Sequence, residues 1–164
     1  MPALLIVYHS ATGGTRRMAQ AAAAGARAAA PGDEVRLLHA DSAGADDLLR
    51  ADGYLFATPE NLAAVSGVLK HFFDRTYYAV LDRIAARPYA CMICAGSDGA
   101  NAARQIERIA TGWRLRAVAA PVVVCTHAQT PERILAEKHL SAGDLERCRE
   151  LGATLAGGLA LGIF

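Results

Sequence analysis

The sequence predicts an α/β fold in which helices cover both faces of a parallel β-sheet. Short apolar runs of strand length alternate along the chain with longer segments that have helical periodicity. Several of the junctions that lead from a strand into a helix are rich in glycine and in hydroxyl or amide residues. Alternating strands and helices are typical of parallel βαβ units, so we expect a three-layer αβα sandwich.

Five strands and five helices are expected. The predicted strands are Leu4–Tyr8, Val35–Leu38, Tyr54–Ala57, Tyr89–Ala95 and Val118–Cys125. The predicted helices are Thr15–Ala30, Ala45–Ala51, Val65–Ile84, Ala100–Gly112 and Ser141–Leu161. Pro31 and Gly32 end the first helix, Pro88 follows the third, and Ser141 with Asp144 caps the last. Five such strands favour the sheet order 2-1-3-4-5, with a switch point between strands 1 and 3.

Composition indicates one ordered domain over residues 1–164, because 53% of the residues are hydrophobic and 20% are charged. The formal net charge of +1 offers no basic field for nucleic acid. No basic region precedes the first apolar run, and the apolar stretch Leu151–Phe164 is too short to span a bilayer. We therefore expect a cytoplasmic protein without a nucleic-acid or membrane partner.

Two of the four cysteines, Cys91 and Cys94, form a C-x-x-C pattern, which can indicate a redox pair or a metal site. Both lie inside the predicted strand Tyr89–Ala95. Residues three apart on a strand point to opposite faces, so these sulfurs are expected to be separate core residues. No metal site is expected.

Three loops follow the carboxyl ends of predicted strands 1, 3 and 4, where ligands bind in this topology. We call them the first loop (His9–Thr15), the second loop (Thr58–Gly67) and the third loop (Gly96–Asn101). The first loop leads into a helix N-terminus, whose free N–H groups and positive dipole favour an anion. Its hydroxyl residues add donors, so a ligand that carries phosphate is expected there.

Several phosphate-binding classes are excluded by the residues around the first loop. No lysine follows Gly13 and Gly14, as a P-loop would require, and the dinucleotide pattern G-x-G-x-x-G is absent. The loop has no cysteine for a phosphatase, and predicted strand 3 ends without the aspartate of a receiver domain. A mononucleotide such as FMN remains.

Three segments resemble flavodoxin-like FMN proteins: Tyr8–Thr15, Ala57–Asn61 and Ser66–Arg75. The similarity is greatest to the NADPH-dependent FMN reductases and the quinone reductases of the tryptophan-repressor-binding-protein type. The first segment fits the family phosphate pattern S-x-T-G-x-T. The resemblance implies a flavodoxin-like fold, FMN as cofactor and NAD(P)H as electron donor. It also implies a quinone, flavin or similar small-molecule acceptor and a homodimer or homotetramer.

We expect the cofactor-binding residues in the three loops. They are Ser10, Thr12, Gly13, Gly14 and Thr15, then Pro59, Glu60, Asn61 and Leu62, then Gly96, Ser97, Asp98 and Gly99. Asp98 is expected to form a turn rather than to catalyse. No catalytic residue is identified, because the flavin itself carries hydride chemistry.

Some alternatives stay open at this point. The second and third loops lack the aromatic residue that many relatives place against the flavin, so its face is expected to be open or covered by a neighbouring subunit. His9 and His127 either contact ligand or are structural, and Arg16 and Arg17 either attract phosphate or are solvated. A flavodoxin-type electron carrier and a non-catalytic flavin-binding module are the alternative functions. The near-neutral charge favours the enzyme.

Overall fold

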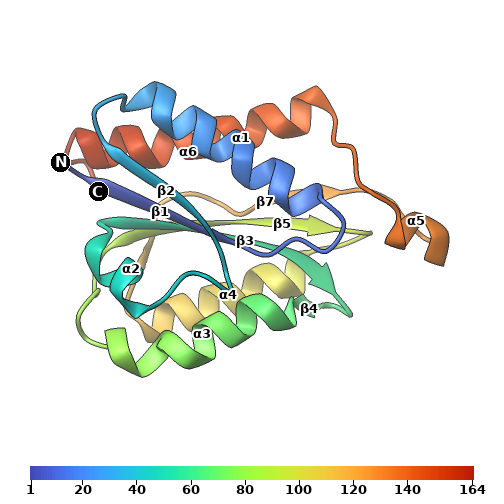
Figure 1. Ribbon diagram of the computed structural model, residues 1–164, viewed down its shortest axis with the longest axis horizontal. Coiled ribbons are helices and arrows are strands. Elements are labelled where there is room, and N and C mark those ends of the chain that lie inside the picture. Colours follow the sequence, from blue (N-terminus) through green and yellow to red (C-terminus); the bar gives the residue numbers. More distant parts are fainter.

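The computed structural model describes residues 1–164 and has a parallel sheet between two layers of helices (Figure 1). Four strands lie in the order β2-β1-β3-β5, all parallel. They are β2 (Glu34–His39), β1 (Ala3–Tyr8), β3 (Gly53–Asn61) and β5 (Pro88–Ala95). Two short strands, β6 (Arg116–Ala117) and β7 (Val122–Cys125), share the fifth position and both pair parallel with β5. The predicted flavodoxin-like order of five parallel strands is confirmed.

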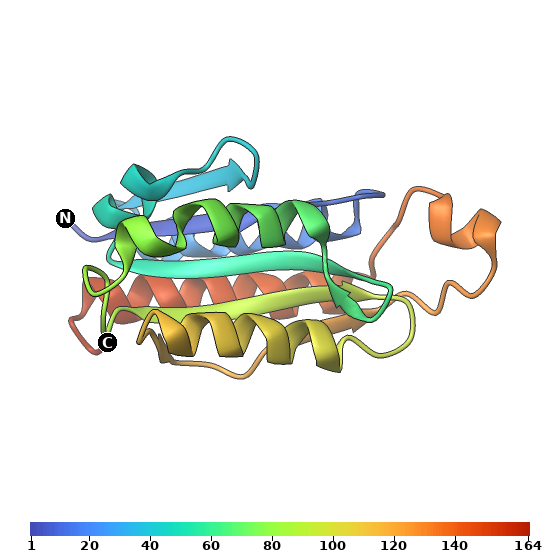
Figure 2. The same ribbon diagram turned by 90° about the horizontal axis from the view of Figure 1, so that it is seen from below.

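Helices cover both faces of this sheet. One face packs against α1 (Gly14–Ala29) and α6 (Ala142–Ala160), and the other against α3 (Gly67–Val80) and α4 (Ala100–Gly112) (Figure 1). The short α2 (Ala45–Arg50) joins β2 to β3 on the α3 side. A further short helix, α5 (Pro131–Leu135), was not predicted and projects beyond the carboxyl ends of the strands (Figure 2).

Several predicted boundaries were wrong. Strand β3 continues past Ala57 to Asn61 and turns back into the antiparallel β4 (Ala64–Val65), so Val65 belongs to a strand and α3 begins after Ser66. The Ser66 hydroxyl accepts a hydrogen bond from the Leu69 amide and thereby fixes that start. The predicted strand Val118–Cys125 is interrupted before Val122, because Pro121 has no N–H to donate to the sheet.

The two faces of the sheet have different cores. The α3–α4 side is aromatic, and the rings of Phe56 and Phe73 meet edge to face with centroids 5.1 Å apart. The α1–α6 side is rich in alanine, and the two helices approach closely at Gly25 and Gly152. Phe72 and Phe73 of α3 are both buried in this aromatic core.

The C-x-x-C cysteines point to opposite faces, as predicted. Cys91 packs in the aromatic core and Cys94 in the alanine-rich core. Burial raises the pKa of Cys91 to about 12 and that of Cys94 to about 11, so both thiols stay protonated at neutral pH. None of the helices has the length and apolar character needed to cross a bilayer.

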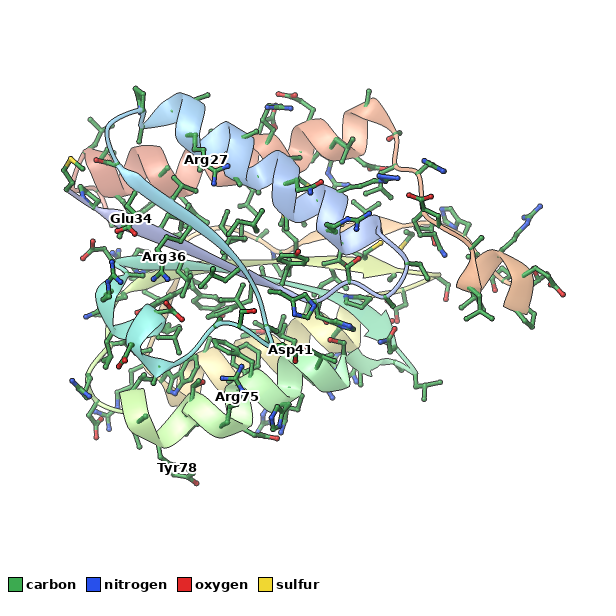
Figure 3. The ribbon with its side chains drawn as sticks, viewed as in Figure 1. Arg27, Glu34, Arg36, Asp41, Arg75 and Tyr78 are labelled. Carbon is green, nitrogen blue, oxygen red and sulfur yellow. The ribbon has the colours of Figure 1, made fainter.

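An arginine fixes the loop after β2 against α3. Arg75 donates from Nη1 to the Ala43 carbonyl at 2.7 Å and from Nη2 to the Ala40 carbonyl at 2.5 Å (Figure 3). On β2 itself, Arg36 pairs with Asp47 at the start of α2. These contacts hold the edge of the sheet that adjoins β1 and therefore support the strand from which the first loop emerges.

Candidate functional site

A cavity of about 210 Å³ lies at the carboxyl ends of β1, β3 and β5. All three predicted loops contribute to its walls. The predicted residues that line it are Ser10, Thr12, Gly14, Thr15, Pro59, Glu60, Asn61 and Gly96. The switch-point topology thus brings together loops that are far apart in sequence.

The first loop presents an unpaired set of hydrogen-bond donors. Gly13 has a φ of 94°, a left-handed conformation that suits glycine, and its amide donates to the Ser10 hydroxyl at 3.1 Å. The amides of Thr12, Gly14 and Thr15 have no acceptor in the chain. The Thr15 hydroxyl is buried and also has no partner. Because buried polar groups are normally paired, this loop has the donors that an anion would satisfy.

The first loop also lies close to β5. A Cβ atom at Gly14 would lie 2.6 Å from the Cys94 sulfur and 3.3 Å from the Lys138 Cβ. Glycine at this position therefore lets the helix N-terminus sit directly against the sheet.

The second loop forms the β3–β4 hairpin and is fastened to α4. The Glu60 carboxylate accepts hydrogen bonds from the amides of Gly99 at 2.8 Å and Ala102 at 3.1 Å. Asn101 donates to the Ala63 carbonyl, and the Gln105 side chain accepts from the Val65 amide at 2.7 Å. Glu60 thus caps the N-terminus of α4 and joins the second loop to the third.

Several predicted site residues do not line this cavity. The Leu62 side chain at the hairpin tip is fully exposed, and Gly13, Ser97, Asp98 and Gly99 lie outside the lining. The Asp98 carboxylate accepts from the Ala100 amide at 3.2 Å, which matches the turn-forming role expected for it. Gly99 has a φ of 87°, and its backbone amide donates a hydrogen bond to the Glu60 carboxylate.

Part of the cavity wall comes from a segment of which the sequence analysis considered only His127. We call Thr126–Leu140, which includes α5, the strap; its residues Thr126, Ala128, Ile134, Leu135 and Lys138 line the cavity. Nothing local in the sequence indicates this contact, because the strap and the first loop are more than 100 residues apart.

Arg17 joins α1 to the strap. Its Nε donates to the Lys138 carbonyl at 2.8 Å, and its Nη2 pairs with the Glu137 carboxylate at 2.6 Å. The sequence left two roles open for Arg17, phosphate contact or free solvation. The structure instead shows that Arg17 connects α1 to the strap.

The two candidate histidines lie outside the cavity lining. His9 packs edge to face against His39, and its Nδ1 is buried without a partner. Burial lowers the pKa of His9 from its usual value, and His39 lowers it further, so the neutral imidazole is favoured. His127 has a φ of 57°, and its backbone amide donates a hydrogen bond to the Gly96 carbonyl. This bond connects the strap to the third loop.

Comparison with known sequences identifies the family. Residues 33–130 match the family described as NADPH-dependent FMN reductase. The chain belongs to this family. The match supports FMN as the cofactor and fits NAD(P)H as the donor, in agreement with the resemblance noted in the sequence. The matched range begins after the first loop, so the assignment of that loop depends on its own geometry.

Two curated relatives match parts of this FMN reductase family member. A flavodoxin of Aquifex aeolicus is 45% identical over 74 residues, which cover 45% of this chain and 40% of the relative. An NAD(P)H dehydrogenase (quinone) of Acidithiobacillus ferrooxidans is 32% identical over 46% of this chain and 48% of the relative. The matches span less than half the length of either relative.

Solved structures share the fold over nearly the whole chain. An archaeal flavodoxin superimposes with a TM-score of 0.77 at 18% identity and covers 96% of this chain and 98% of its own. A protein described as a flavodoxin, WrbA-like, from Agrobacterium tumefaciens gives a TM-score of 0.72 at 22% identity. The superposition covers 98% of this chain and 99% of that protein. At these identities the likeness is one of fold.

The residues present fit the phosphate end of FMN. Free amides, the unpaired Thr15 hydroxyl and a helix N-terminus converge on one wall of the cavity. The cavity volume is below the roughly 300–1,000 Å³ of sites that enclose a whole small-molecule ligand. It therefore suits part of a mononucleotide, and the donors are those a phosphate needs.

Proposed function

We propose that this protein is an FMN-dependent NAD(P)H oxidoreductase that reduces a small-molecule acceptor such as a quinone or free flavin. When bound, FMN would supply the redox chemistry by accepting a hydride from NAD(P)H and passing two electrons on. The chain's own residues would bind and orient the cofactor. Ser10, Thr12, Gly13, Gly14 and Thr15 would hold its phosphate, with Ser10 shaping the loop through its bond to the Gly13 amide.

The single observation that carries this proposal is the unpaired Thr15 hydroxyl beside the free amides of the first loop. Such a group destabilises the protein unless a ligand satisfies it. The other two loops would contact the rest of the flavin. Pro59, Asn61 and Gly96 would do so from the cavity lining, and Glu60 would hold the two loops together through its cap on α4. Leu62, Ser97, Asp98 and Gly99, which lie outside the lining, would contact the part of the flavin that extends beyond the cavity.

The alternative function is a flavodoxin-type electron carrier, which the similarity to the Aquifex aeolicus flavodoxin favours. Two observations favour the enzyme instead. The formal net charge is only +1, whereas a carrier that docks on basic reductases is expected to be acidic. The cavity lining also contains no aromatic side chain that could stack on the flavin.

Anaerobic reduction distinguishes these functions. The purified protein, loaded with FMN, is mixed with NADPH or NADH in the absence of oxygen, and the flavin absorbance at about 450 nm is followed. The oxidoreductase should lose this absorbance with at least one donor and regain it when a quinone is added. Bound flavin that neither donor reduces would support the carrier or a binding module, and failure to bind FMN would contradict all three.

The exposed apolar side chains near the site support the proposal of a homodimer or homotetramer. Leu62 and Leu135 are 101% and 77% exposed, and Ile134 is half exposed. A second copy that covered these residues would also shield the open flavin face. Light scattering of the wild-type protein and of Leu62→Ser tests this, since a monomeric wild type would contradict it.

A further inference from the structure

The strap brings one lysine to the first loop. The Lys138 amide donates to the Thr12 carbonyl at 2.9 Å, while its carbonyl accepts from Arg17 at 2.8 Å. The backbone of Lys138 is therefore fixed both to the first loop, through Thr12, and to the first turns of α1, through Arg17. The position of this residue is set by the fold and does not depend on its own flexible side chain.

The ammonium group of Lys138 lies at the first loop. Its Nζ is 3.2 Å from the Thr12 hydroxyl, and it also bonds the carbonyls of Ile134 at 2.8 Å and Ala136 at 2.6 Å. Two of these partners belong to the strap itself, and the third belongs to the first loop. No carboxylate lies within salt-bridge distance of Lys138, so its charge is not neutralised by the protein.

The cavity lining contains one side chain of each charge. Among the lining residues, Lys138 is the only cation and Glu60 the only anion. Arg17 is already paired with Glu137. The neutral donors of the first loop supply hydrogen bonds but no full positive charge, so Lys138 is the one lining residue that can add a charge-assisted bond to a phosphate there.

We propose that Lys138 is a ligand of the cofactor's phosphate, supplied by the strap to a loop that has no lysine of its own. The Thr12 hydroxyl holds its ammonium group beside the site, and a phosphate there takes over this donor through a charge-assisted bond. The same contact ties the strap down when the cofactor is bound. This inference rests on the proposed function, because it takes FMN as the phosphate-bearing ligand.

The test compares FMN with riboflavin, which has the same ring system and no phosphate. Affinities are measured by flavin fluorescence for the wild type, Lys138→Met, Lys138→Arg and Lys70→Met. Lys70 is the only other lysine in the chain and lies on the exposed side of α3, paired with Asp74, which makes it the matched control. Loss of a charge-assisted contact should weaken FMN binding by roughly 10- to 100-fold in Lys138→Met.

Riboflavin affinity should change by less than about twofold in Lys138→Met, and Lys138→Arg should retain part of the FMN affinity because it keeps the charge. Added salt should weaken FMN binding less in Lys138→Met than in the wild type. Lys70→Met should match the wild type for both ligands.

A second measurement does not depend on replacing Lys138. Trypsin can cut the strap after Arg133, which is exposed. FMN should slow this cleavage in the wild type at saturation, whereas saturating riboflavin should not. Equal protection by both ligands would overturn the proposal.

The remaining outcomes separate this inference from the proposed function. A wild-type chain that binds no FMN would overturn both. A wild type that binds FMN, with Lys138→Met binding it equally well, would overturn the role of Lys138 alone. An equal loss of FMN and riboflavin affinity in Lys138→Met would give Lys138 a purely structural role and also overturn it.

Discussion

Thr15 carries a hydroxyl group that the folded chain buries without a hydrogen-bond partner. Valine has nearly the same shape and no polar atom, so Thr15→Val should raise the free energy of unfolding of the FMN-free protein by about 1 kcal/mol. The same change should weaken FMN binding by roughly 5- to 20-fold, because a phosphate donor is lost. Urea unfolding and flavin fluorescence measure the two effects.

Thr76→Val is the matched control for this prediction. Thr76 is equally buried, but its hydroxyl donates to the Phe72 carbonyl at 2.7 Å and lies in α3, away from the cavity. Its replacement should give no gain in stability and leave FMN affinity unchanged. A Thr15→Val protein that is less stable, with normal FMN affinity, would show that the hydroxyl has a structural role.

At the scale of single elements, the β3–β4 hairpin has a strained turn. Leu62 and Ala63 both have positive φ, 50° and 60°, in a two-residue connection that normally favours asparagine and glycine. Ala63→Gly should therefore raise the free energy of unfolding by roughly 0.5–1 kcal/mol, since glycine adopts this backbone conformation without steric cost. Thermal or urea unfolding measures the change.

Ala64→Gly provides the control in the neighbouring position. Ala64 is in β4 and is not among the residues with positive φ, so glycine there should lower stability by roughly 0.5–1 kcal/mol. If both glycine variants were destabilised alike, the turn would not hold the strain assigned to it.

The same hairpin shows why some elements could not be predicted. Leu62 and Ala63 give no turn signal, so the sequence offered only a loop after Ala57, and the extension of β3 depends on contacts of Glu60, Asn101 and Gln105 with remote partners. The first loop was predictable because its donors, glycines and helix start are contiguous. Lys138 was not, since its place at that loop is set by tertiary contacts with Thr12 and Arg17.

At the scale of the whole molecule, the pattern of strands and helices was enough to predict the layers and the strand order. It did not predict how α1 and α6 approach each other. Gly25 and Gly152 occupy their crossing, where an added Cβ at Gly25 would lie 2.0 Å from the Arg149 carbonyl oxygen. The alanine-rich core of this face requires that close approach, and α1 carries the first loop at its N-terminus.

Gly152→Ala should therefore be severely destabilising. A Cβ there would lie 1.9 Å from the Ala22 carbonyl oxygen, which is backbone and cannot move aside without separating the two helices. We expect a loss of more than about 3 kcal/mol in the free energy of unfolding, measured by urea denaturation. Gly157→Ala is the control in the same helix, because nothing lies within 4 Å of its added Cβ. It should stabilise the protein by roughly 0.5–1 kcal/mol through helix propensity, and equal stability of the two variants would contradict the close helix crossing.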